Sequence, residues 1–120
     1  MTGTATEEEL IASGKFDANR IIQHTGTDIT DDVLEIGCGL GRIGFEYSEH
    51  CKTWTGSDIS PNMLDFANKR LVQKRNVKLI ELRASDLSIL PDKSFDVVYC
   101  SVVFMHLDEW DRYFPCNQTP

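Results

Sequence analysis

A glycine-rich segment at residues 33–44, VLEIGCGLGRIG, holds the residues of this chain that are best suited to chemistry. A short apolar run leads into it, and Gly37, Gly39 and Gly41 then stand at alternate positions. Glycine adopts positive φ readily and has no side chain, so such a turn can bring bare backbone against a small molecule. The pattern predicts a cradle for a nucleoside-containing cofactor. A flexible loop without a ligand is the alternative.

Two classes of cofactor fit this segment. Gly39, Gly41 and Gly44 match the G-x-G-x-x-G spacing of dinucleotide-binding folds, which seat a pyrophosphate on a helix N-terminus. Glu35 lies two residues before the first glycine, where its carboxylate would repel a pyrophosphate. The acid therefore favours a cationic ligand, whose amino group it could hold; bracing the loop is its other possible role.

Residues 34–41 resemble the first motif of the class I S-adenosylmethionine-dependent methyltransferases, which runs apolar, acid, apolar, Gly, x, Gly, x, Gly. The resemblance extends over about residues 33–107. It implies that the cofactor is S-adenosylmethionine, which carries a sulfonium and an ammonium group. The residues of the first motif that it assigns to cofactor binding are Glu35, Gly37, Cys38, Gly39 and Gly41.

The segment GSDISPNML resembles the second motif of the same family. Asp58 follows the glycine turn by about 20 residues, the spacing of an acid that accepts hydrogen bonds from a ribose diol. Capping the next helix is the alternative role for this acid. The resemblance implies that Ile59 packs on the adenine face, and Met63 is assigned to the same cofactor site.

Residues beyond the third and fourth expected strands complete the implied site. In the segment RASDL, the resemblance implies that Asp86 accepts from the adenine amino group and that the backbone amide of Leu87 meets the ring. Ser101 would lie beside the methionine part of the cofactor, and the imidazole of His106 could act as the catalytic base. A turn acid at Asp86 and a polar helix cap at His106 are the alternatives.

The elements that must position these residues alternate between strands and helices. Apolar runs predict strands at 33–36, 54–57, 77–82 and 95–103, and helices are expected at 7–22 with a break near 13–14, at 42–50 and from 61 onward. Ser60 and Pro61 form an N-cap followed by proline at the first helical position. We therefore expect a doubly wound, Rossmann-like α/β fold with a mostly parallel sheet and helices on both faces.

The resemblance also sets the expected domain organisation. Residues 1–32 would form a helical lead-in and residues 33–120 an incomplete methyltransferase-type domain. The family's fold continues through a fifth strand and an antiparallel hairpin, for which no pattern follows Trp110. In the family's sheet order, third, second, first, fourth, the fourth strand is left on an edge. We therefore expect self-association through that edge.

Composition and charge limit the possible partners. The chain has 120 residues, 41% of them hydrophobic, which suits one modest core. A net charge of −7 disfavours unaided binding to nucleic acid or an anionic membrane, and we expect a small molecule, not protein or RNA, as methyl acceptor. The four cysteines form no C-x-x-C pair, which favours reduced thiols in a cytoplasmic protein over a metal site.

The activity implied by the resemblance is methyl transfer from the cofactor sulfonium to an unidentified acceptor, by in-line attack. A cofactor-binding or regulatory module without catalysis, pairing with a partner chain, is the alternative. An NAD-linked oxidoreductase is the third interpretation, because the dinucleotide spacing is also present.

Overall fold

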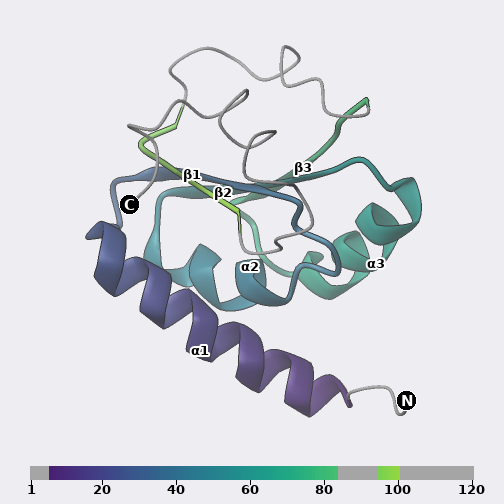
Figure 1. The fold of residues 1–120 in the computed structure, drawn as a ribbon, viewed down its shortest axis with the longest axis horizontal. Helices are drawn as coiled ribbons and strands as arrows, with labels where there is room; N and C mark the ends of the chain where they lie inside the picture. Colours follow the sequence, from purple (N-terminus) through teal and green to yellow (C-terminus); the bar gives the residue numbers. More distant parts are fainter. Residues whose placement is uncertain (1–5, 84–94, 101–120) are drawn as a thin grey trace, which may run out of the picture.

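The computed structural model describes residues 6–83 and 95–100, which form a parallel four-stranded sheet with helices packed against it (Figure 1). The helical elements are α1 (Glu7–Thr25), α2 (Arg42–Tyr47), the 3-10 turn η1 (Ser48–His50) and α3 (Pro61–Leu71). The strands are β1 (Asp32–Ile36), β2 (Thr53–Asp58), β3 (Val77–Glu81) and β4 (Val97–Tyr99). The strand order β3-β2-β1-β4 confirms the expected order and the Rossmann-like α/β class.

In the part of the chain that is described, α1, α2 and α3 all lie on the same face of the sheet (Figure 1). Successive side chains of a strand point to opposite faces, so the strands divide the apolar residues into two clusters. The larger cluster includes Ala18, Ile43 and Leu71, one from each helix. The smaller cluster is built on Leu34 and Ile36 of β1. None of the described helices covers this second face, so helices on that face stay a prediction.

Trp54 fills the middle of the larger cluster, and two glycines make room for it. A methyl group at Gly44 would lie 2.4 Å from the indole ring, and one at Gly56 would lie 2.6 Å from it. The indole Nε1 donates to the hydroxyl of Tyr99 at 3.0 Å, and the Tyr99 ring stacks on Tyr47 with the centroids 5.2 Å apart. These contacts fix β4 to β2 and to α2.

The first helix is continuous, so the break expected near residues 13–14 is wrong. It begins after the N-cap Thr6 and ends at Gly26, which takes the left-handed conformation. Gly14 lies against the backbone of α2, because a Cβ at this position would come within 2.0 Å of the Arg42 carbonyl oxygen. The glycine allows two helices to approach closely and does not interrupt α1.

Replacing Gly14 with alanine is therefore expected to lower the free energy of unfolding. In the exposed middle of a helix, the same change would raise stability by about 0.5–1 kcal/mol. Here the added methyl group must push α1 away from α2, and overpacking of this kind costs about 1–3 kcal/mol. Urea denaturation followed by circular dichroism measures the difference. A more stable Gly14→Ala variant would contradict the close helix contact.

The third helix begins as predicted. The hydroxyl of Ser60 accepts a hydrogen bond from the backbone amide of Met63 at 3.2 Å, and Pro61 is the first helical residue. The helix expected at 42–50 is α-helical as far as Tyr47 and then tightens into the 3-10 turn. Both elements return the chain to the sheet, so that β1, β2 and β3 run parallel.

The fourth strand is shorter in the described residues than the sequence predicts. It begins at Val97 and pairs with β1, and it stands at one end of the sheet order. Asp96 precedes it and accepts a hydrogen bond from the amide of Asp32 at 2.8 Å, which aligns the starts of the two strands. Residues 101–103 of the expected strand lie outside the described ranges.

Two findings concern residues 6–83 and 95–100 as a whole. No helix there is long and apolar enough to cross a bilayer. No group of His, Cys, Asp and Glu side chains in these ranges is arranged to hold a metal ion. Cys38 and Cys51 are buried free thiols.

Candidate functional site

The loop after β1 has the backbone conformation that its glycines predict. Gly37, Gly39 and Gly41 have φ values of 77°, 55° and 78°, a region that favours glycine. A Cβ built on Gly37 or Gly39 would meet no atom of residues 6–83 and 95–100 within 4 Å, so none of these residues fills that side of the loop. At Gly41 a Cβ would lie 2.9 Å from Leu71, which brings α3 against the base of the loop.

Four amides of the loop, those of Gly37, Cys38, Gly39 and Gly41, are already bound to oxygen atoms of the protein. The amides of Gly37 and Cys38 donate to the carbonyl of Ser57 at 2.7 and 2.9 Å, and that of Gly41 donates to the carbonyl of Cys38 at 3.0 Å. The amide of Gly39 donates to Asp58 Oδ2 at 2.8 Å. A pyrophosphate site needs such amides free to donate to the phosphate. The hydrogen bonds therefore disfavour the dinucleotide interpretation.

Asp58 lies where β2 ends, directly beside the glycine loop. Register pairing of β1 with β2 brings the carboxyl ends of the two strands together. Besides the Gly39 contact, Asp58 Oδ1 accepts from the amide of Ser60 at 3.0 Å. A carboxylate oxygen has more than one acceptor position, so each can still accept from a ligand hydroxyl. The structure thus brings the predicted ribose acid and the predicted loop together, and it also gives Asp58 a role at the start of α3.

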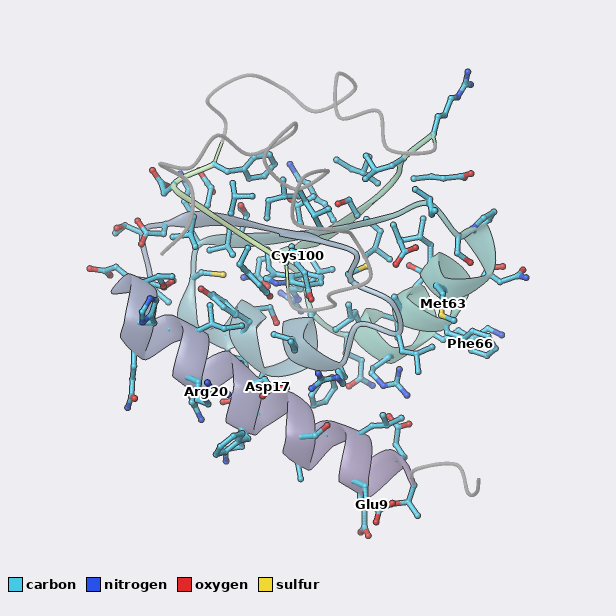
Figure 2. The ribbon with its side chains drawn as sticks, in the orientation of Figure 1. Glu9, Asp17, Arg20, Met63, Phe66 and Cys100 are labelled. Carbon is cyan, nitrogen blue, oxygen red and sulfur yellow. The ribbon has the colours of Figure 1, made fainter. Side chains whose placement is uncertain are left out.

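Two apolar side chains next to Asp58 face solvent. Ile59 is 58% exposed and Met63 is 40% exposed. Figure 2 shows Met63 and Phe66 projecting from neighbouring turns of α3. Exposed apolar side chains beside a half-buried acid suit contact with a ring such as adenine. The other predicted site residues, Asp86, Leu87, Ser101 and His106, lie outside the described residues.

Glu35 lies in the core and not on the open side of the loop. It is 1% exposed, and its Oε1 accepts a hydrogen bond from the hydroxyl of Tyr99 at 3.3 Å. Burial, followed by the charge of Glu35, raises the pKa of Tyr99 well above its usual value, so Tyr99 is a neutral donor. This placement gives Glu35 a contact with β4, and the two roles predicted for it, holding a cofactor amino group and bracing the loop, stay predictions.

Cys38 is a packing residue inside the loop. Its Sγ lies against Gly56, where an added Cβ would come within 2.9 Å. Burial, with the carboxylates of Glu35 and Asp58, raises the pKa of the Cys38 thiol far above its usual range. A protonated thiol is a poor nucleophile. The small side chain of Cys38 therefore serves to pack the glycine loop and not to react.

The raised thiol pKa values predict slow alkylation in the folded protein. Burial raises the pKa of Cys51 to about 12, and that of Cys38 is also raised, so little thiolate is present near neutral pH. We expect iodoacetamide at about pH 8 to leave both residues unmodified until urea unfolds the chain. Peptide mapping by mass spectrometry shows which of the two cysteines is modified in the folded and in the unfolded chain. Rapid labelling of Cys38 in the folded state would contradict its burial.

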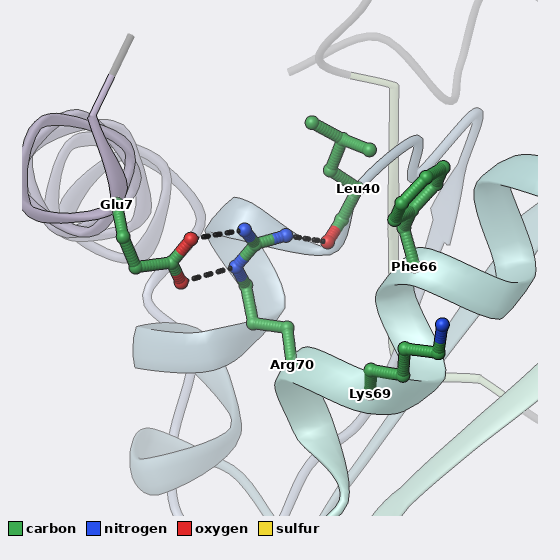
Figure 3. A pocket seen from close by; sticks show the side chains of 5 residues that line it. All are labelled: Glu7, Leu40, Phe66, Lys69 and Arg70. Atoms are coloured by element: carbon green, nitrogen blue, oxygen red, sulfur yellow. Dashed lines mark hydrogen bonds and ion pairs between the residues drawn. The ribbon is translucent and has the colours of Figure 1, made fainter.

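Sequence reasoning missed one residue that contacts the loop. Arg70 of α3 donates from Nη1 to the carbonyl oxygen of Leu40, 2.6 Å away, and forms an ion pair with Glu7 of α1 (Figure 3). Arginine and glutamate at these positions have no recognisable spacing relative to the glycines. Only the fold brings them together.

A glycine loop after β1 and an acid after β2, on a parallel sheet of order β3-β2-β1-β4, are the features of a class I S-adenosylmethionine-dependent methyltransferase. Residues 34–115 match a family described as a methyltransferase domain. The match covers more than half of the chain, so this chain belongs to that family.

Relatives of known name are similar to more than two thirds of the chain. An rRNA adenine N-6-methyltransferase from Limosilactobacillus reuteri is 24% identical over 85 residues, which are 71% of this chain. Phosphoethanolamine N-methyltransferase 1 from Arabidopsis thaliana is 32% identical over 83 residues, or 68% of this chain. The solved structure of phosphoethanolamine N-methyltransferase 1 from Haemonchus contortus, in complex with phosphoethanolamine and S-adenosylhomocysteine, has a TM-score of 0.64 and 24% identity over 79% of this chain.

The chain is much shorter than these relatives. It spans 35% of the Limosilactobacillus protein, 17% of the Arabidopsis protein and 20% of the Haemonchus chain. The likeness to the Haemonchus enzyme concerns the fold, because the identity is low. The family match, over residues 34–115, contains the glycine loop and Asp58.

Proposed function

We propose that this chain binds S-adenosylmethionine and supplies the donor side of a methyl transfer. The observation that carries the proposal is the contact between the amide of Gly39 and the carboxylate of Asp58, 2.8 Å apart. It joins the loop after β1 to the acid after β2 at the carboxyl edge of the sheet, where ligands bind in this class of fold. The open side of the loop leaves room for a ligand at that edge.

The described site residues contact different parts of the cofactor. The methionine portion lies on the open side of Gly37 and Gly39, because neither position has a side chain to occupy that space. Asp58 accepts hydrogen bonds from the ribose diol. Ile59 and Met63, both exposed beside it, cover the adenine ring.

The remaining predicted residues complete the proposed site. Asp86 and Leu87 bind the adenine amino group and ring edge, Ser101 lies beside the methionine portion, and His106 takes a proton from the acceptor. When bound, S-adenosylmethionine supplies an electrophilic methyl group on a sulfonium. The chain contributes by orienting donor and acceptor in line and by excluding water, which lowers the barrier through orientation alone.

A small molecule is the proposed acceptor. The relatives named above include an rRNA adenine N-6-methyltransferase and a phosphoethanolamine N-methyltransferase, so both kinds of enzyme occur among proteins similar to this chain. The net charge of −7 opposes unaided binding to RNA, and the more similar of the two relatives acts on the small molecule. A cytoplasmic location is proposed with it, because Cys38 and Cys51 are free thiols.

A methyl-transfer screen tests the activity. The chain is incubated with S-adenosylmethionine labelled in the methyl group, together with panels of small amines, proteins and RNA. Label transferred to a small amine supports the proposal. Transfer to RNA alone contradicts the proposed acceptor, and cofactor binding without any transfer favours a non-catalytic module.

The alternative module is favoured by the position of β4 at the end of the sheet order. A strand edge with free backbone groups pairs readily with another chain. We therefore expect the isolated chain to self-associate, with a mass in multi-angle light scattering that rises with protein concentration. A soluble monomer at high concentration would contradict this expectation.

A further inference from the structure

Arg70 joins three elements that are far apart in the sequence. Its Nε and Nη2 donate to the two carboxylate oxygens of Glu7 at 2.9 and 2.6 Å, and its Nη1 donates to the carbonyl oxygen of Leu40 at 2.6 Å (Figure 3). Glu7 stands in the first turn of α1, Arg70 in the last turn of α3, and Leu40 in the glycine loop. One guanidinium group therefore connects the cofactor loop to two helices.

The ion pair with Glu7 sets the direction in which Arg70 donates to the loop. Two parallel hydrogen bonds to one carboxylate fix the plane of a guanidinium group. With that plane fixed, Nη1 points at the Leu40 carbonyl. A lysine at this position would keep the charge but could not hold a carboxylate in a fork and a carbonyl at the same time.

Glu7 is itself held in place. The first turn of α1 is closed by a capping box, in which Thr6 and Glu9 exchange hydrogen bonds of 2.8 and 3.0 Å. Further along the helix, Gly14 fixes α1 against α2. The hydrogen bond from Arg70 lowers the pKa of Glu7, so the carboxylate is charged at neutral pH and the pair is fully formed.

Leu40 is the point in the loop where this support is needed. It lies between Gly39 and Gly41, and glycine loses more conformational freedom on folding than any other residue. Asp58 holds the amide of Gly39, and Arg70 holds the carbonyl of Leu40. The two contacts restrain the loop from opposite ends of a short stretch of backbone.

We propose that Arg70 is a positioning residue for the cofactor loop and that Glu7 orients it, so that the first turn of α1 determines how tightly the loop binds its ligand. The inference rests on the proposed function, because the ligand is the adenosyl cofactor. Neither residue needs to touch the cofactor. Their effect passes through the Leu40 carbonyl.

The chain provides a matched control for this ion pair. Lys74 and Glu49 also form an ion pair, with side-chain exposures of 16% and 56%, against 12% and 58% for Arg70 and Glu7. The control pair joins η1 to the segment after α3 and makes no contact with the glycine loop. The two glutamates should therefore contribute similarly to stability, while only Glu7 should influence the ligand.

The test compares Arg70→Gln, Arg70→Lys, Glu7→Gln and Glu49→Gln by calorimetric titration with S-adenosylhomocysteine, well below the melting temperature of each variant. We expect Kd to rise about tenfold in Arg70→Gln, a change of 1.4 kcal/mol, with a smaller rise in Glu7→Gln. Arg70→Lys should not restore the affinity, and Glu49→Gln should leave it unchanged. Equal losses in Glu7→Gln and Glu49→Gln, or full affinity in Arg70→Lys, would overturn the proposal.

A second measurement follows the conformation of the glycine loop in the absence of any ligand. In proton–nitrogen NMR spectra, the amide signals of Gly39, Leu40 and Gly41 should shift and broaden in Arg70→Gln but not in Glu49→Gln. Unchanged loop signals would overturn the role of Arg70 whatever the affinities are. If the unmodified chain binds no S-adenosylhomocysteine, the proposed function fails, and so does the proposed effect of Arg70 on ligand affinity. Altered loop signals in Arg70→Gln would then still support positioning of the loop by Arg70.

Discussion

Replacing Gly39 with valine is expected to abolish measurable binding of S-adenosylhomocysteine. The residue has φ of 55°, and its missing Cβ would point into the open side of the loop. A branched side chain would fill the space proposed for the cofactor and would resist the left-handed conformation. Isothermal titration calorimetry measures the loss of binding.

Gly26→Val is the matched control for this prediction. Gly26 also has positive φ, of 72°, and a Cβ there would likewise meet nothing within 4 Å. It follows α1 and precedes β1, whereas Gly39 follows β1. Both variants should lose about 1–2 kcal/mol of stability from backbone strain, but Gly26→Val should still bind the ligand. Equal affinity in the two variants would remove Gly39 from the site.

Replacing Asp58 with alanine is expected to weaken binding of S-adenosylhomocysteine about tenfold to 150-fold. Hydrogen bonds to a charged group contribute about 1.5–3 kcal/mol, which corresponds to this range of affinity. The variant should also be less stable, because the carboxylate accepts from the amides of Gly39 and Ser60. Calorimetry and thermal unfolding separate the two effects.

The control for Asp58 is Ser60→Ala. The Ser60 hydroxyl caps α3 by accepting from the amide of Met63, so its removal should cost about 1 kcal/mol of stability and leave ligand affinity intact. If Asp58 served only the start of α3, Asp58→Ala would behave in the same way. Reduced stability with unchanged affinity in both variants would contradict the ribose role.

Local signals are sufficient to predict the strands and the loop, whereas the order of the strands is implied by the family resemblance. An apolar run followed by alternating glycines determines β1 and its turn, and the three glycines do take positive φ. Ser60 and Pro61 determine the start of α3 through a side-chain hydrogen bond and a fixed φ. Each of these features depends on residues that are close together in the sequence, which is why the pattern was enough.

Tertiary contacts account for what the sequence did not predict. The local sequence predicts that Gly14 interrupts a helix. In the structure, its role depends on the Arg42 carbonyl, which belongs to another helix. The Glu7 and Arg70 pair joins residues 63 positions apart, and nothing in the spacing of either residue indicates its partner. Glu35 was assigned from its distance to the glycines, whereas its side chain points to the core because β1 alternates between two faces.

The central claim is that the loop after β1 and Asp58 bind an adenosyl cofactor carrying a methionine group. Titration of the unmodified chain with S-adenosylhomocysteine and, separately, with NAD tests it most directly. We expect saturable binding of S-adenosylhomocysteine with one site per chain and no heat of binding for NAD, because four of the loop amides are already bound to protein oxygens. Binding of NAD without S-adenosylhomocysteine, or of neither ligand, would contradict the assignment.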